Sequence, residues 1–487
     1  MSRRDPVWRI ARVVLEAQTP LSITTGTPDG AFDTRLVTDA NGLPAIPGTS
    51  VAGVLRHLWT TLADDSVSAT EEMFGVQRGD KGRPSRVETS WGALVDSQGH
   101  PAEGLLLGEQ AARLRQDPVL AAAARLQDDP AWRHRVRLSE RGAAAGTGKF
   151  DRSILPAGHR FALELRLRGG TEADWERLLG LLNHPLFRLG GSTRSGLGRM
   201  RPVRVHIGTF LLDEPQSARR FTQLSQGLAE VDGLEPCSPD RLESPDSECL
   251  EGTLVLTARG YWRLGQGLPR DDTAEKPADL LPVTEPRIEW SGGRGQPGQN
   301  ALLFAASSLK GALAHRMSFH ADRHAQRWAG ETAAGDEEGG PAPEVRALLG
   351  EVKGNSDDGA AGHAGCLYLD DAWAPLESER LARLMHIAID RFTGGVRDRV
   401  LYDEEAIHGG AVRIPVTLDC RALRRRTQDK DSAVLRALND TLRDLGTGQL
   451  ALGSRTTTGN GFFTGRLEGP LGEWLEQQSI AARGSAA

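Results

Sequence analysis

The sequence predicts an α+β chain built from two tandem domains of the same ferredoxin-like (RRM-like) order. Two observations predict this class. Motifs of the first half recur in the same order in the second half, and each half has the pattern strand, helix, strands, helix, strand. With 487 residues, the chain is long enough for two or three domains, each with its own core.

Four matching stretches carry the repeat. DTRLVTD at 33–39 matches DLLPVTE at 279–285, an offset of 246 that places Asp33 on Asp279. TSVAGVL at 49–55 matches SSLKGAL at 307–313, an offset of 258, so the second copy has a loop that is 12 residues longer; we assign the extra residues to 291–300. Residues 73–75 and 92–96 match 348–350 and 365–370, and the Gly-rich stretch 190–200 matches 452–463. We therefore expect two homologous domains, 1–215 and 248–487, joined by a polar linker at 216–247.

The elements of each copy follow the same order. Alternating apolar residues predict opening strands at 8–16 and 252–259. A helix is then expected to begin at a hydroxyl cap, Thr49 or Ser50 in the first copy and Ser307 or Ser308 in the second. Amphipathic spacing predicts late helices at 172–182 and 432–445, and closing strands follow at 199–207 and 461–467.

The middle of each copy predicts a basic β-hairpin. Residues 131–160 and 387–411 each have an alternating strand with outward Arg residues, a Gly-rich tip and a return strand. A hairpin that projects from the core and binds a ligand is one interpretation. An ordinary solvated hairpin is the other, and the spacing does not decide between them.

The overall composition limits the classes of function. With 59 basic and 65 acidic residues, the net charge of -6 excludes a polybasic, histone-like protein but not a local basic groove. Aromatic residues make up only 5% of the chain, which argues against nucleic-acid binding through aromatic platforms. The four cysteines show no CxxC spacing, which favours a reduced cytoplasmic compartment over a disulfide scaffold or a Cys-based zinc site. The sequence has no predicted signal peptide and no predicted transmembrane helix.

Three motifs resemble the RAMP superfamily, the subunits that form the backbone of CRISPR ribonucleoprotein effectors. They are PLSITTG at 20–26, IPGTSVAGVLR at 46–56 and GGSTRSGLGR at 190–199. Two fused domains of this kind are similar to the tandem backbone subunit of type III complexes, particularly type III-D. The second copy departs further from the pattern. The usual Lys before the helix Gly is Ala52 in the first copy and Lys310 in the second, and the usual Arg after the helix is Arg56 in the first copy but Ala314 in the second.

The resemblance implies a function and two catalytic residues. Type III backbone subunits cleave target RNA paired to the guide with one acidic residue in the loop after the first strand; this residue is Asp33 here, and Asp279 is its equivalent. The implied enzyme is a metal-dependent endoribonuclease in which Asp33 and Asp279 act as a base or hold Mg²⁺ or another divalent cation. Without the resemblance, Asp33 would be a turn-forming residue in a TPDGAFD loop.

The resemblance also implies which residues contact RNA, and that each hairpin is the thumb of its domain. These residues occupy the helix starts, the Gly-rich loops and the two thumbs: Ser50, Arg56, Arg137, Arg141, Lys149, Gly191, Arg194, Gly196, Gly198, Arg199, Ser308, Lys310, Arg397, Arg399, Gly453, Arg455, Gly459 and Gly461. A thumb would wedge into the guide–target duplex and flip a base pair. Recognition would be independent of sequence, because base pairing reads the sequence and the protein holds phosphates.

The leading hypothesis is thus a guide-RNA-binding backbone subunit of a type III CRISPR effector, which acts in antiviral defense in the cytoplasm, away from membranes. Its partners would be the CRISPR guide RNA, complementary target RNA and other effector subunits. The main alternative is a non-catalytic RNA-binding scaffold in the same kind of complex. A guide-processing endonuclease and a protein-binding adaptor are the remaining alternatives.

Overall fold

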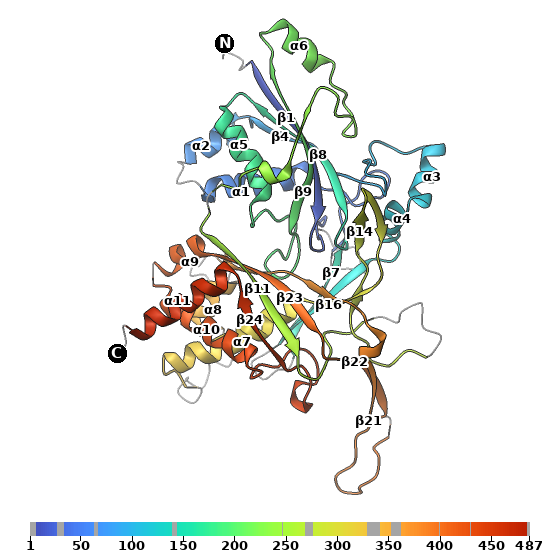
Figure 1. Cartoon of the computed structure of the whole chain (residues 1–487), viewed down its shortest axis with the longest axis vertical. Helices are drawn as coiled ribbons and strands as arrows, with labels where there is room; N and C mark the ends of the chain where they lie inside the picture. The colour runs from blue at the N-terminus through green and yellow to red at the C-terminus, as the bar shows by residue number, and fades with distance from the viewer. Residues whose placement is uncertain are drawn as a thin grey trace. The chain divides into compact units, whose positions relative to one another are not determined.

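The computed structural model describes residues 6–26, 34–62, 67–138, 144–245, 247–267, 276–328, 341–351, 362–398, 400–428 and 430–484 (Figure 1). The chain forms two compact units. Unit 1 contains residues 1–193, 197–247 and 286–299, and unit 2 contains residues 194–196, 248–285 and 300–487.

Unit 1 contains an antiparallel sheet, helices and two separate hairpins. Its strands are β1 (Val7–Ala17), β2 (Val76–Arg78), β3 (Lys81–Arg83), β4 (Val87–Thr89), β5 (Ala93–Leu94), β6 (Ala131–Leu138), β7 (Ala144–Ile154), β8 (Arg160–Arg168), β9 (Met200–Leu211), β10 (Glu235–Cys237), β14 (Ile288–Ser291) and β15 (Arg294–Pro297). Its helices are α1 (Gly48–Leu62), α2 (Val67–Phe74), α3 (Glu109–Gln116), α4 (Pro118–Arg125), α5 (Glu172–Gly180) and α6 (Pro215–Thr222), with 3₁₀ turns at Leu181–Asn183 and Pro239–Arg241.

The main sheet of unit 1 has the strand order β10-β9-β1-β8-β4, and β5 also pairs with β8. Both neighbours of β1 run antiparallel to it. Because side chains alternate along a strand, Val13 and Leu15 of β1 face the apolar sides of α1 and α5 in one buried core. The order β9-β1-β8-β4 is compatible with a ferredoxin-like arrangement, and the predicted strand 8–16 and helix 172–182 are confirmed as β1 and α5.

Segment 216–247, which we expected to be a linker, is part of unit 1. It includes β10, which extends the sheet at β9. On the other face of β1, the buried Arg12 pairs with Glu164 at 2.8 Å and also donates to the backbone oxygens of Ser225 and Glu230. These bonds give a buried charge its partners and hold segment 216–247 on the sheet.

The longer loop of the second copy also belongs to unit 1. Residues 288–297 form the two-stranded hairpin β14–β15. Trp290 donates from Nε1 to the Gly158 oxygen at 2.8 Å, and the Arg160 guanidinium lies 3.8 Å from the Trp290 ring centroid. The extra residues therefore form an ordered element that packs on unit 1.

Unit 2 repeats the same core arrangement with additional small sheets. Its strands are β11 (Cys249–Ala258), β12 (Tyr261–Trp262), β13 (Thr284–Glu285), β16 (Ala301–Phe304), β17 (Gly350–Glu351), β18 (His363–Ala364), β19 (Leu367–Leu369), β20 (Ala372–Ala374), β21 (Leu381–His386), β22 (Tyr402–His408), β23 (Ala411–Asp419) and β24 (Phe463–Glu468). Its helices are α7 (Ala306–His324), α8 (Pro343–Leu349), α9 (Cys420–Thr427), α10 (Ser432–Gly446) and α11 (Pro470–Gly484), with 3₁₀ turns at Ser378–Arg380 and Thr456–Thr458.

The main sheet of unit 2 has the order β19-β23-β11-β24, equivalent to β4-β8-β1-β9 in unit 1. The sequence match of 92–96 to 365–370 was wrong: β19 takes the place of β4, and Ala372, which pairs with Phe304 as Gly92 pairs with Ile46, takes the place of Gly92. Helices α7 and α10 contribute Leu313 and Leu438 to the core beside Leu256 of β11. The predicted strand 252–259 and helix 432–445 are confirmed as β11 and α10.

Backbone hydrogen bonds confirm the register of the repeat on both sides of the longer loop. The amide of Ala45 donates to the Val37 oxygen at 3.0 Å in unit 1, and the amide of Leu303 donates to the Val283 oxygen at 2.9 Å in unit 2. These pairs correspond at the two offsets found between the matching stretches, 246 for the valines and 258 for their partners. Among the described residues, no helix is both long and apolar enough to cross a membrane.

Candidate nucleic-acid interface

The Gly-rich loop of the first copy is held by three backbone hydrogen bonds. The amide of Leu189 donates to the Gly198 oxygen, the amide of Gly191 donates to the Ser22 oxygen, and the amide of Gly198 donates to the Pro20 oxygen, all at 2.8 Å. The loop is thus fixed against the residues that follow the first strand.

The Gly-rich loop of the second copy has the same three bonds. Leu452 donates to Gly461 at 2.8 Å, Ser454 donates to Arg263 at 2.9 Å, and Gly461 donates to Tyr261 at 2.8 Å, in each case from amide to backbone oxygen. The identical pattern shows that the two loops are structural equivalents.

Backbone conformation extends this match to single residues. Ser192 and Arg455 both have φ of 58°, the left-handed region that non-Gly residues seldom adopt. At Gly461 (φ 81°), an added Cβ would lie 2.0 Å from the Leu452 oxygen, so only Gly fits there. Arg455 therefore corresponds to Ser192 and not to Arg194, so the basic residues of the two loops occupy different positions.

Arg194 and Gly196 are engaged by other groups of unit 2. Arg194 donates from Nε to the Gly365 oxygen at 2.6 Å, and its guanidinium lies 4.8 Å from the Tyr368 ring centroid. Gly196 accepts a hydrogen bond from the Asp371 amide at 3.3 Å. Arg194, predicted as an RNA contact, thus has protein partners in this structure.

Arg455 lies over a buried carboxylate. Its Nη1 donates to the Tyr402 hydroxyl at 2.6 Å, and its Nε lies 3.4 Å from Oε1 of Glu404. Glu404 is fully buried. Its Oε2 also pairs with Nε of Arg263 at 3.2 Å, and its Oε1 pairs with Nε2 of His386 at 3.0 Å. The sequence pattern did not reveal this cluster, because its members come from four separate segments of the chain.

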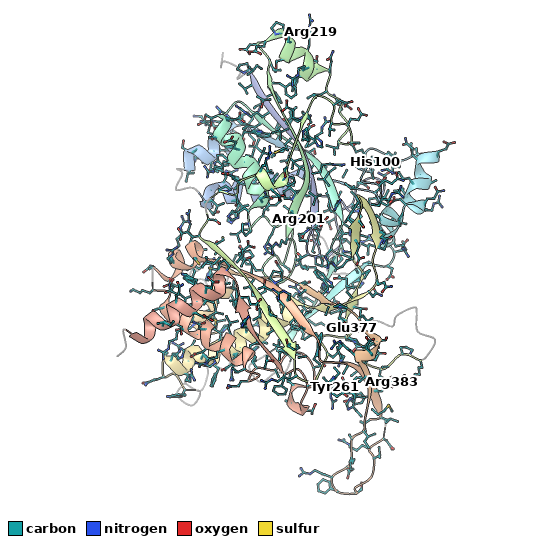
Figure 2. All side chains as sticks on the ribbon, viewed as in Figure 1. His100, Arg201, Arg219, Tyr261, Glu377 and Arg383 are labelled. Carbon is teal, nitrogen blue, oxygen red and sulfur yellow. The ribbon has the colours of Figure 1, made fainter. Side chains whose placement is uncertain are left out.

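Asp279 forms a reciprocal pair with Asp403, the neighbour of Glu404 on β22. The Asp279 amide donates to Oδ1 of Asp403 at 2.9 Å, and the Asp403 amide donates to Oδ2 of Asp279 at 3.1 Å. The first of these bonds, together with Arg383 on β21 (labelled in Figure 2), lowers the pKa of Asp403. Asp279 itself is exposed. The Asp279 loop and the Gly-rich loop of unit 2 therefore both attach to β22, at adjacent residues.

Asp33 lies outside the described residues, but its neighbour Thr34 is fixed. The Ser153 hydroxyl on β7 donates to the Thr34 oxygen at 2.5 Å, and the Ser22 hydroxyl donates to the Ser153 oxygen at 3.0 Å. A pocket of about 250 Å³ opens beside this junction, with Thr34, Arg35, Gln127, Trp132 and Ser153 in its lining. Thr34, the first described residue after the predicted catalytic Asp33, thus lines this pocket.

The first predicted hairpin is present as the antiparallel pair β6–β7. Its predicted contacts Arg137 and Lys149 are exposed, and Arg141 lies outside the described residues. Sequence reasoning missed two further arginines at its base. Arg135 donates to the Ser192 hydroxyl at 3.0 Å, and a Cβ added to Gly191 would lie 2.4 Å from Nη1 of Arg152. The alternation of Arg133, Arg135 and Arg137 was the available signal, because residues two apart share one face of a strand.

The second hairpin differs from its predicted bounds. Its paired strands are β21 and β22, so the first strand ends at His386, just before the predicted start at 387. Arg397 is exposed in the segment between them, and Arg399 lies outside the described residues. This segment also exposes large apolar side chains, including Ile389 and Phe392, the latter 94% exposed.

The starts of α1 and α7 carry the remaining predicted contacts. The predicted hydroxyl cap of α7 was wrong: the helix begins at Ala306, whose amide donates to Oδ1 of Asp371 at 2.8 Å. Helix α1 begins at Gly48, before the predicted Thr49 or Ser50. Ser308 is exposed, as is Arg56, whereas Lys310 donates to the Leu349 oxygen at 3.3 Å.

A glycine sits at the same position within each of these helices. Gly53 in α1 and Gly311 in α7 are exposed, and a Cβ at either would meet no atom within 4 Å. Neither glycine is required by packing within the described chain, although Gly costs about 1 kcal/mol relative to Ala in a helix. Both positions leave an open helix surface.

Other predicted contacts are the framework of the loops rather than charged groups. Gly191 and Gly198 carry backbone bonds of the first loop, while Gly453 and Gly461 shape the second, and Gly459 closes its turn at φ 102°. The Arg199 amide donates to the Thr19 hydroxyl oxygen at 2.9 Å.

Comparison with known families explains the repeat. The model of the RAMP superfamily matches residues 14–201 and 293–464, one stretch for each copy and more than half of the chain. The chain belongs to the RAMP superfamily. No curated protein matches it. RAMP proteins work in CRISPR ribonucleoprotein complexes, so family membership points to a CRISPR-associated, RNA-binding subunit.

The loop of Asp279 shows whether the residues present fit the divalent cation that the resemblance implied. At Asp279, Oδ2 accepts a backbone amide, and Asp403 uses both of its oxygens within the protein. Among the described residues, Oδ1 of the exposed Asp279 has no hydrogen-bond partner. One carboxylate oxygen fits a hydrated Mg²⁺ that takes its other ligands from water and phosphate, and does not fit an all-protein cage.

Proposed function

We propose that this RAMP protein is the tandem backbone subunit of a type III, III-D-like, CRISPR effector that cleaves complementary target RNA in the cytoplasm. Its partners are a guide RNA, the target RNA and other effector subunits. The observation that carries the proposal is the pair of equivalent Gly-rich loops, each fixed by the same three hydrogen bonds beside the residues that follow the first strand. In unit 2 the same strand, β22, also holds the loop of Asp279.

The two units would bind RNA by shape and phosphate charge. Exposed Arg56 on α1 and exposed Arg137, Lys149 and Arg397 on the hairpins supply cations that phosphates can approach. The hairpins act as thumbs that splay the duplex. In unit 1, the pocket beside Thr34 offers Trp132, Gln127 and Ser153 to a base that leaves the stack.

Cleavage would use the nucleophile of the RNA itself. The 2′-oxygen bonds to the adjacent phosphorus while the bond from phosphorus to the 5′-oxygen breaks. The 2′-hydroxyl proton passes to the carboxylate of Asp33 or Asp279, and the leaving 5′-oxygen takes a proton from water. The products are a 2′,3′-cyclic phosphate end and a 5′-hydroxyl end. A hydrated Mg²⁺ held by Asp33 or Asp279 would stabilise the charge on the phosphate.

Cleavage by the reconstituted complex tests this proposal. The variants Asp33→Asn and Asp279→Asn should each lose one set of cuts, and the double variant should lose both, with guide binding unchanged. Asp322→Asn is the matched control, because Asp322 is a half-buried residue of α7 whose side chain is 43% exposed and pairs only with Arg327 among the described residues. If the double variant keeps the full cut pattern, the two aspartates do not catalyse the cleavage.

A non-catalytic scaffold is the second candidate, and one observation favours it for unit 2. The reciprocal bonds between Asp279 and Asp403 already use part of the Asp279 carboxylate for folding the loop. In that case Asp279→Asn would keep every cut while loosening the loop, and cleavage would depend on Asp33 alone.

A further inference from the structure

Helices α7 and α10 of unit 2 face each other through a ladder of histidines and carboxylates. His320 and His324 lie one turn apart on α7, and Asp440 and Asp444 lie one turn apart on α10. Nε2 of His320 meets Oδ2 of Asp444 at 2.7 Å, and Nε2 of His324 meets Oδ2 of Asp440 at 2.9 Å. Residues four apart project from the same face of a helix, so both histidine–aspartate pairs of this ladder lie at the contact between the two helices.

The second nitrogen of His320 has no partner in this ladder. His320 is 2% exposed, and its buried Nδ1 has no hydrogen-bond partner among the described residues. An unpaired buried polar atom costs about 1–3 kcal/mol. Because Nε2 faces the Asp444 carboxylate, the unpartnered Nδ1 is the ring nitrogen left for a metal ion.

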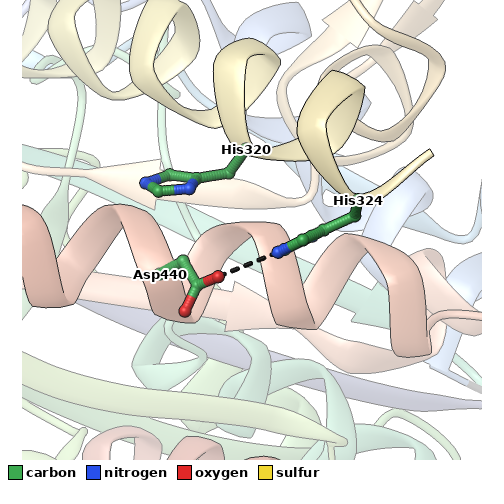
Figure 3. A group of neighbouring side chains, drawn as sticks. All are labelled: His320, His324 and Asp440. Atoms are coloured by element: carbon green, nitrogen blue, oxygen red, sulfur yellow. Dashed lines mark hydrogen bonds and ion pairs between the residues drawn. The ribbon is translucent and has the colours of Figure 1, made fainter. Parts of the chain in front are cut away.

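Two further ligand atoms lie close by. Potential donor atoms of His320, His324 and Asp440 all lie within 4.8 Å of one another, as Figure 3 shows for the three side chains. A cation that replaces the proton between His324 and Asp440 would gain both ligands and release that proton.

We propose that His320, His324 and Asp440 form a Zn²⁺ site that ties α7 to α10. Two imidazoles and one carboxylate are a donor set that zinc accepts with water in the fourth position. Asp444 orients His320 through its other ring nitrogen, which is the usual outer-shell partner of a metal-bound histidine. This site is independent of Asp33 and Asp279 and of the function proposed above.

Arginines surround the two carboxylates. Arg316 contacts Asp444 at 2.6 Å, while Arg323 and Arg443 contact Asp440 at 2.9 and 3.0 Å. The side chains of Arg323 and Arg443 are 42% and 54% exposed, so they can turn into water when a cation binds. The competing explanation is a ladder held by protons and arginines alone, and the experiment separates the two.

Zinc binding to the full chain is the test. The chain is freed of metal with a chelator, then titrated with Zn²⁺ against a competing chelator and with Co²⁺ by visible absorption. The wild type should bind one tightly held ion with a tetrahedral Co²⁺ spectrum and a raised melting temperature. The isosteric variant Asp440→Asn and the variant His324→Gln should bind at least about 100-fold more weakly, and Asp444→Asn about 10–100-fold more weakly.

His315→Gln is the matched control, because His315 lies on the same helix but is exposed and outside the cluster. It should bind zinc like the wild type. Circular dichroism of each metal-free variant shows whether it is folded. The proposal is wrong if the folded wild type binds zinc no more tightly than His324→Gln, or if His315→Gln lowers binding as much as Asp440→Asn does.

Discussion

Removing the buried carboxylate of Glu404 should unfold the part of unit 2 that carries the Gly-rich loop. Glu404 is 0% exposed and neutralises Arg263, which is 5% exposed. Truncation by Glu404→Ala leaves that guanidinium buried and unpaired, which costs about 3–5 kcal/mol. Glu404→Gln keeps the shape and some hydrogen bonds but removes the charge, and should cost about 1–3 kcal/mol.

The assay is native-state hydrogen exchange of the β22 amides, since the two-unit chain need not unfold in one step. The free energy of opening of β22 should fall by the amounts above, with Glu404→Ala the more severe. Glu468→Gln is the control, because its partners Arg413 and Arg466 are exposed and such surface pairs contribute about 0–1 kcal/mol. A loss below about 0.5 kcal/mol for Glu404→Ala would refute the reasoning, since a buried charge would then need no partner.

Three other predictions concern the RNA face and the stability of the units. Arg56→Ala should weaken RNA binding and reduce the slope of log affinity against log salt by about 1, while leaving the melting temperature unchanged, because Arg56 is exposed. Gly461→Ala should destabilise unit 2 by more than about 1 kcal/mol in urea denaturation, because its Cβ would lie 2.0 Å from a backbone oxygen, whereas Gly311→Ala should stabilise it by up to about 1 kcal/mol. Burial lowers the pKa of His159 and of His184 to about 4, so both are neutral in the folded unit 1 and protonate near pH 6.5 only when it unfolds. Stability should therefore be full above pH 6.5 and fall by about 2 kcal/mol per histidine on acidification to pH 5, and His159→Gln should remove about half of that loss; a flat profile between pH 7.5 and 5 would contradict this.

The sequence predicted the repeat and its register because these depend on local patterns. Apolar alternation predicted β1 and β11. The matched stretches around Val37 and Val283 predicted two residues whose backbone oxygens accept equivalent hydrogen bonds. Left-handed turns that require glycine made the two loops recognisable in the sequence.

The sequence did not reveal which segments each core would recruit. Segment 216–247 looked like a polar linker, yet the buried Arg12 holds it on the sheet through backbone oxygens, which any residue type can supply. The hairpin β14–β15 likewise packs on unit 1 through Trp290, a contact between residues far apart in the chain. Composition carries no signal for such contacts.

In the candidate site, too, the sequence predicted the residues that lie in motifs and missed their long-range partners. Asp279 and Arg455 were predicted from their motifs, but the carboxylates of Asp403 and Glu404 that hold them were not. These partners come from a strand that lies more than a hundred residues away from Asp279, and a buried ion pair leaves no periodic pattern. The correspondence of Arg455 with Ser192 also needed the backbone angles.

The most direct test of the account is a structure of the chain bound to guide and complementary target RNA within its complex. The account predicts RNA phosphates along the Gly-rich loops and the exposed faces of α1 and α7, with the carboxylates of Asp33 and Asp279 each beside the 2′-oxygen of a splayed nucleotide. RNA bound on another face, with both carboxylates turned towards protein, would contradict it.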